Sequence, residues 1–88
     1  MTDQTPSPMP GTPLDGGIVV ASVLFREADD EIPDDLETVL VLYPEQPFFG
    51  VGVVWTRDGY PWEVDEYPHR HLNIVPAVRE YEQTGGDY

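Results

Sequence analysis

The chain has 88 residues with 17 Asp and Glu, four Arg, no Lys and no Cys, and its formal net charge is −13. This length holds one domain at most, and the lack of Cys excludes disulfide bonds and thiolate catalysis. The charge disfavours direct binding to nucleic-acid phosphates and to anionic membranes, and it favours a basic protein partner.

Composition also bears on stability, source and location. So small a domain is marginally stable alone, so a partner or a homo-oligomer is a reasonable source of further stability. Arg without Lys is typical of GC-rich coding, as in actinobacteria and their phages; a salt-adapted source is the alternative. Residues 1–16 do not resemble a signal peptide, and no apolar run reaches the ~20 residues that span a bilayer. The sequence therefore predicts a cytoplasmic protein that does not enter a membrane.

The N-terminal segment differs in composition from the rest of the chain. Residues 1–16 contain four Pro and only two large apolar side chains after Met1, a composition typical of a disordered, Pro-rich arm. We therefore expect a single domain over residues 17–84, followed by a flexible tail at 85–88.

Two segments have the composition of buried strands. Residues 17–26 and 36–43 are rich in β-branched residues, and both alternate faces of each segment are apolar. A strand that is apolar on both faces is buried on both, inside a sandwich, a barrel or an oligomer. The segment YPEQP at 43–47 then predicts a turn.

An acidic segment separates these strands. Residues 27–37 hold seven carboxylates in eleven positions. The clustered acids and the lack of a central Gly do not fit a calcium-binding loop. The pattern favours a solvated acidic loop, whose candidate residues are Asp29, Asp30, Glu31, Asp34 and Asp35.

A β-hairpin is predicted over residues 48–66. Asp58-Gly59 is a strong signal for a two-residue turn between the strand at 48–56 and a return strand at 60–66. This turn would pair Trp55 with Trp62; a rival register with a bulge at Gly59 would pair Trp55 with Pro61. Pro61 places the return strand at a sheet edge, because proline cannot donate to a ladder.

Two further expectations concern the fold. Gly50 and Gly52 leave one face of their strand bare, so another backbone or a helix could approach closely there. After a connector at 67–72, we expect a short helix from Asn73 to the stop at Gly85-Gly86, with Ile74, Val78 and Tyr81 docked on the sheet. The predicted fold is α+β: an antiparallel meander of about four strands, or a small SH3-like barrel, with one C-terminal helix.

The chain offers few residues that could act in catalysis. Ser7 lies in the predicted arm, Ser22 lies mid-strand, and phosphate-binding glycine motifs are absent. His69 and His71 could bind Zn²⁺ or Ni²⁺ with a nearby carboxylate, but this spacing is common, and exposed connector histidines are favoured. We expect no enzyme, no cofactor and no metal.

The predicted edge strand carries the candidate site. Aromatic side chains rimmed by acids are typical of an interface for a basic or Arg-bearing partner. The sequence therefore predicts a small accessory protein, host-modulating or phage-encoded, that binds a basic protein. The alternatives are an acidic nucleic-acid mimic that blocks a DNA-binding protein, and a self-assembling subunit. The candidate interface residues are Trp62, Tyr60, Glu63, Asp65, Glu66 and Arg57.

Overall fold

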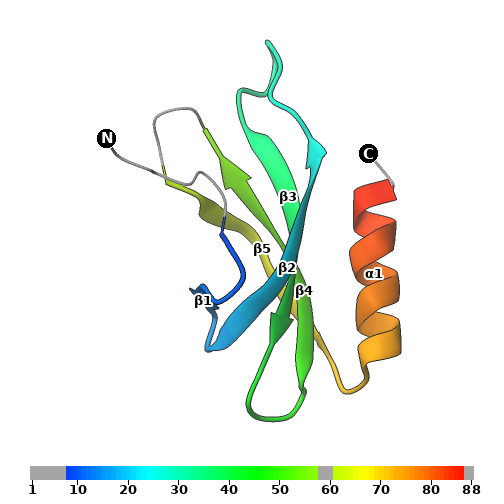
Figure 1. Ribbon diagram of the computed structural model, residues 1–88. Helices are drawn as coiled ribbons and strands as arrows, with labels where there is room; N and C mark the ends of the chain where they lie inside the picture. Colours follow the sequence, from blue (N-terminus) through cyan, green and yellow to red (C-terminus); the bar gives the residue numbers. More distant parts are fainter. Residues whose placement is uncertain (1–7, 58–60, 87–88) are drawn as a thin grey trace.

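The computed structural model describes residues 8–57 and 61–86, which form one antiparallel sheet and one helix (Figure 1). This confirms the α+β class with a C-terminal helix. The sheet has five strands rather than about four, in the order β1-β2-β3-β4-β5, and it curls into a half-barrel. The elements are β1 (Pro13–Leu14), β2 (Gly17–Arg26), β3 (Asp35–Leu42), β4 (Phe49–Thr56), β5 (Glu63–His71) and α1 (Ile74–Gly86).

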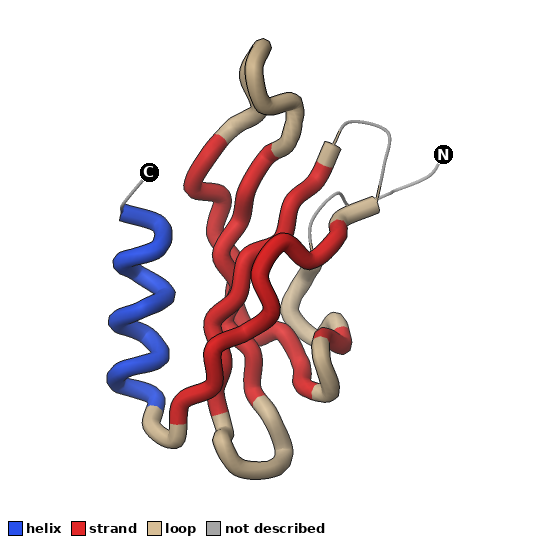
Figure 2. The backbone as a smooth tube through the Cα atoms, turned by 180° about the vertical axis from the view of Figure 1, so that it is seen from behind, coloured by secondary structure: helices blue, strands red, loops and turns tan. Residues whose placement is uncertain are grey.

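Each face of the sheet has its own apolar core. Helix α1 lies against one face (Figure 2), where Ala77 packs with Leu40 and Val51. The opposite, concave face buries Leu14, Val19, Val39, Val41, Tyr43 and Val54. In β3, adjacent residues therefore enter different cores, as Val39 and Leu40 do, which explains why this strand is apolar on both faces. The expected burial of both faces is wrong for β2, where large apolar side chains are 42–48% exposed: Ile18, Val20, Val23 and Leu24.

The ordered domain begins earlier than the predicted boundary at Gly17. Asp15 and Gly16 have positive φ angles of 53° and 84°, and they form a two-residue turn that pairs Leu14 with Gly17. The side chain of Leu14 is only 6% exposed, and the carbonyl of buried Pro8 accepts a hydrogen bond from the Ser22 hydroxyl. Residues 8–16 thus contribute to the concave core, and residues 1–7 of the predicted arm lie outside the described residues.

The sheet curls where β5 closely approaches the glycines of β4. A Cβ on Gly52 would lie 2.8 Å from the Glu66 carbonyl oxygen and 3.2 Å from the Pro68 nitrogen. A Cβ on Gly50 would lie 2.7 Å from Pro68 Cβ. The expected close approach at this pair of glycines is confirmed, and the approaching backbone is that of β5.

The predicted register of the hairpin is wrong. Trp55 lies opposite Glu63 and Val54 lies opposite Val64, so neither Trp62 nor Pro61 is the partner of Trp55. A shift of one residue exchanges the two faces of a strand, and it brings Val64 to the concave face with Val54. Burial of Val64 and Trp62 against that core outweighs the expected Trp–Trp pair. Asp58-Gly59 and Tyr60 lie outside the described residues.

Two element boundaries also differ from the prediction. Strand β5 continues through the expected connector to His71, since Pro68 falls at a register shift on an edge strand, where proline is tolerated. On α1, the fully buried residue is Ala77, whereas Ile74 is 44% exposed, so Ile74 is not a docking residue. The small Ala77 side chain allows the helix to approach the sheet closely.

The close approach at Gly52 is testable by a Gly52→Ala substitution. The added methyl group would meet main-chain atoms of β5, which cannot move aside as a side chain could. We expect the free energy of unfolding to fall by about 3 kcal/mol in urea denaturation. Gly11→Ala is the matched control, because its methyl group meets nothing within 4 Å and reports only the strain of a positive φ. Equal losses in the two variants would contradict the close approach.

Candidate functional site

Strand β5 forms one edge of the sheet, as the sequence predicts for the return strand. Of the strands that the structure describes, only β4 pairs with it, and the three predicted acidic residues, Glu63, Asp65 and Glu66, are exposed along it. Within residues 8–57 and 61–86, none of these carboxylates has an ion-pair partner. The edge therefore presents three unbalanced negative charges along the side of β5 that faces away from β4.

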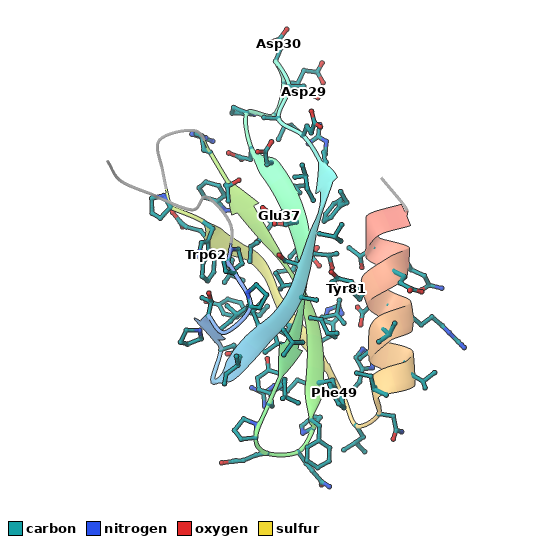
Figure 3. The ribbon with its side chains drawn as sticks, in the orientation of Figure 1. Asp29, Asp30, Glu37, Phe49, Trp62 and Tyr81 are labelled. Carbon is teal, nitrogen blue, oxygen red and sulfur yellow. The ribbon has the colours of Figure 1, made fainter. Side chains whose placement is uncertain are left out.

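The other predicted interface residues have different surroundings. Trp62 is half-buried and packs against the concave core, so much of its ring is structural (Figure 3). Arg57 donates from Nε to Asp34 Oδ1 at 2.8 Å, and its guanidinium lies 5.7 Å from the centre of the Trp55 ring. Arg57 is thus directed toward the acidic loop rather than the β5 edge, and Tyr60 lies outside the described residues.

Tyr67 is an edge residue that sequence reasoning missed. Its side chain is 67% exposed, and it follows Glu66 on β5. The prediction placed residues 67–72 in a connector, so Tyr67 was not counted among the residues of the edge strand. Its position directly after an acidic run was a sequence signal for an interface residue. Exposed tyrosines often anchor protein interfaces.

The acidic loop between β2 and β3 is folded rather than simply solvated. Asp29 Oδ1 accepts hydrogen bonds from the backbone N–H groups of Ile32 and Glu31 at 2.7 and 2.9 Å. These two bonds lower the pKa of Asp29 below its ordinary value. Asp35 Oδ1 accepts from the Ala28 N–H at 2.7 Å, and Asp34 pairs with Arg57. The exposed side chains of Asp30 and Glu31 stand at the tip of this loop.

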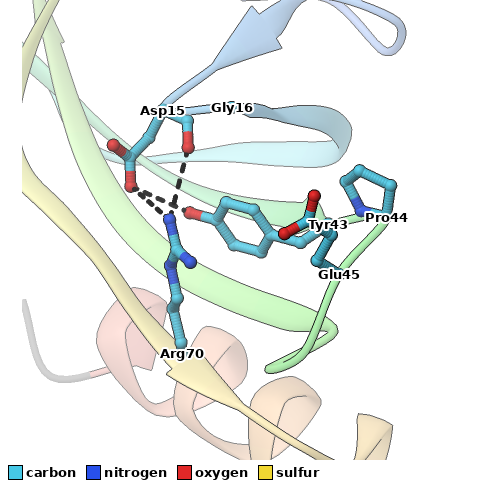
Figure 4. A pocket seen from close by; sticks show the side chains of 6 residues that line it. All are labelled: Asp15, Gly16, Tyr43, Pro44, Glu45 and Arg70. Carbon is cyan, nitrogen blue, oxygen red and sulfur yellow. Dashed lines mark hydrogen bonds and ion pairs between the residues drawn. The ribbon is translucent and has the colours of Figure 1, made fainter.

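A latch joins the β1–β2 turn to β5 beside a pocket of about 220 Å³ (Figure 4). The Arg70 guanidinium donates to Asp15 Oδ2 at 3.3 Å and stacks 4.1 Å from the centre of the Tyr43 ring. The Tyr43 hydroxyl donates to the same carboxylate oxygen at 3.2 Å. Burial, followed by the negative charge of Asp15, raises the pKa of Tyr43 above its ordinary value. Three of the polar side chains that line this pocket, those of Asp15, Tyr43 and Arg70, therefore bind one another.

A second cluster fastens α1 to β5. His69 Nδ1 lies 2.7 Å from Glu80 Oε2, and His71 Nε2 lies 2.6 Å from Glu80 Oε1. Because an ionised carboxylate only accepts hydrogen bonds, each imidazole donates one N–H to Glu80. Partial burial raises the pKa of Glu80, but the bonds from His71 and His69 outweigh it and hold the pKa below the ordinary 4.5.

The same cluster bears on the metal hypothesis for His69 and His71. Both imidazoles direct one nitrogen to Glu80, which gives them a structural role in holding the helix. In the part of the chain that the structure describes, no group of three or more His, Cys, Asp or Glu side chains is placed to hold a metal ion.

The one helix among the described residues, α1, is too short to span a bilayer.

Comparison with known proteins adds no relative. No protein-family model, curated protein or solved structure matches this chain. The charges, edges and contacts of the chain itself are therefore what indicate its function.

The Glu80 cluster predicts a pH-dependent contribution to stability. Glu80→Ala should lower the free energy of unfolding at pH 7 by about 2 kcal/mol, because two charge-assisted hydrogen bonds are lost. The Glu80→Gln variant keeps the shape of the Glu80 side chain but removes its negative charge. Since the folded-state pKa of Glu80 is lowered, the stability due to its charge is complete above the unfolded value of 4.5 and disappears as the pH falls through the folded pKa. In urea denaturation, the difference in the free energy of unfolding between wild type and Glu80→Gln should become smaller below about pH 4.5. A gap that stays constant to pH 3 would contradict this assignment.

The latch is testable by a double-mutant cycle on Asp15→Asn and Arg70→Met. Asn tolerates the positive φ of residue 15, and Met retains the aliphatic stem of Arg70. Since both side chains are more than one-third exposed, we expect a coupling energy of about 0.5–1 kcal/mol in urea denaturation. It should shrink in 1 M salt. Strictly additive effects at low salt would show that the two residues do not interact.

Proposed function

We propose that this protein is a small, non-catalytic accessory protein that binds a basic protein partner along the edge of β5. The single observation that carries this proposal is the exposed edge strand with three carboxylates, Glu63, Asp65 and Glu66, and no facing cation among the described residues. Exposed Tyr67 and the accessible part of Trp62 supply apolar contact area beside these charges.

The pairing of three of the four arginines supports this choice of partner. Arg26, Arg57 and Arg70 each pair with an aspartate of the same chain, at 3.1, 2.8 and 3.3 Å. Arg79 is exposed on α1, and no ion pair among the described residues joins any arginine to the acidic groups of the β5 edge. A partner with clustered Lys or Arg would therefore gain attraction and a faster association rate at this edge.

The nucleic-acid mimic remains the second proposal, and one observation favours it. The acidic loop has a defined shape fixed by Asp29, and it projects Asp30 away from the sheet (Figure 3). The next residue, Glu31, is also exposed. A fixed arrangement of carboxylates could occupy a DNA-binding groove. Arg26 and Arg57 already neutralise part of the loop, which is why we rank the β5 edge first.

Two variants with the same net charge separate these proposals. One replaces Glu63, Asp65 and Glu66 by Gln, Asn and Gln; the other makes the corresponding changes at Glu27, Asp30 and Glu31. With the wild-type protein as bait, a random peptide library should yield sequences rich in Lys and Arg. We expect the affinity for these peptides to fall at least tenfold in the β5 variant and less than threefold in the loop variant.

The reverse outcome would overturn the β5 proposal in favour of the loop. Equal losses in the two variants would show that only net charge matters and would overturn both. Sedimentation at several protein concentrations tests the third alternative, a homo-oligomer. We expect a monomer at low salt, because two copies of charge −13 repel each other.

A further inference from the structure

We propose that the partner binds by adding a strand to β5, and that the added segment alternates basic and apolar residues. This inference rests on the proposed function and names the kind of partner that the same edge accepts. The partner thus contributes an extended segment of a basic protein. It is neither the surface of an already folded domain nor a second copy of this chain.

The first support is the unpaired main chain of β5. A strand at a sheet edge directs every second pair of N–H and C=O groups outward. Apart from the ladder to β4, the residues that the structure describes show no backbone hydrogen bond to β5. The accessible part is Glu63–Tyr67, because His69 and His71 are fastened to Glu80 and Arg70 to Asp15. Five residues span about 17 Å, which suits an added segment of five to seven residues.

The second support is the separation of side chains between the two faces of β5. Glu63 and Glu66 lie opposite Trp55 and Val53, on the same face of β4 as Val51, which packs against α1. Val64 lies opposite Val54 on the concave face, where Trp62 also packs. Side chains of an added strand alternate between these faces. Its basic residues would therefore lie beside Glu63 and Glu66, and its apolar residues beside Val64 and Trp62.

The third support is the charge on the edge itself. Edge strands are commonly protected from unwanted pairing by charged side chains and bulges. Here the carboxylates repel the edge of a second copy, which carries the same charges, but they attract a strand with Lys or Arg at the matching positions. The two register shifts in β5 further restrict pairing to a short segment. The edge thus selects its occupant by charge.

Backbone methylation of a synthetic probe tests this mode of binding. The probe is the capped peptide Thr-Lys-Val-Lys-Val-Lys-Thr, whose affinity for the full chain is measured by calorimetry at low salt. One derivative carries N-methyl groups on the three Lys residues and the other on the two Val residues, so that each blocks a different edge of the peptide strand. Strand addition uses one edge only. We expect one derivative to lose at least tenfold in affinity and the other to stay within threefold of the parent peptide.

Hydrogen exchange gives an independent measurement on the protein. The parent peptide should slow exchange at least tenfold at outward-facing amides within Glu63–Tyr67, whereas a peptide with the same residues and clustered Lys should not. Glu66→Gln should weaken the parent peptide at least threefold. Glu82→Gln, an exposed change on α1, should leave its affinity unchanged.

Each outcome has a distinct meaning for the two proposals. Equal affinities for the parent and both methylated peptides, without protection of β5, would overturn strand addition but leave charge-driven binding intact. If the parent peptide does not bind while library peptides still bind through Glu63, Asp65 and Glu66, strand addition is likewise overturned and charge-driven binding stands. If no basic peptide binds the β5 edge at all, the proposed function and this inference both fail.

Discussion

The bare backbone at Gly50 and Gly52 is the constraint on which the rest of the structure depends. Because no Cβ stands there, Glu66 and Pro68 of β5 approach β4 within contact distance and the sheet curls. The curl creates a concave face that residues 8–16 can cover, with Leu14 buried in it. It also brings Arg70 of the last strand to Asp15 beside the first. The absence of a Cβ at these two glycines therefore allows the sheet to curl and to carry an apolar core on each of its faces.

Charge is distributed unevenly over this frame. Arg26, Arg57 and Arg70 are each held by an aspartate, and two of them also lie over aromatic rings. These cations therefore organise the protein's own loops and turns. Among the described residues, the carboxylates of Glu63, Asp65 and Glu66 at the β5 edge and of Asp30 and Glu31 at the tip of the acidic loop have no ion-pair partner. These three positive charges are thus paired within the fold, while the two surfaces stay negative.

Local signals predicted the strand at 17–26, the edge position of the return strand and the close approach at the glycines. They failed where a long-range contact decided the outcome. The Asp15-Gly16 turn has the same signature as Asp58-Gly59, yet the proline-rich context concealed it. Burial of Leu14 and backbone hydrogen bonds between residues 11–12 and Val19 hold this segment in place. The hairpin register was likewise set by burial of Val64 rather than by the turn. At the site, sequence located the acids on an edge but could not show that Arg57 faces Asp34, or that Glu80 joins both histidines.

The latch also has a consequence for how the chain folds. Asp15 and Arg70 are 55 residues apart, so their contact closes a loop that contains almost the whole sheet. Contacts between such distant residues slow folding, because the entropy of closing the loop is lost before the contact forms. The β1–β2 turn precedes β5 in the chain, so it is made first during synthesis. Until β5 joins the sheet, Asp15 lacks Arg70 and the latch cannot form. The half-barrel is therefore complete only when the last strand of the sheet has been added.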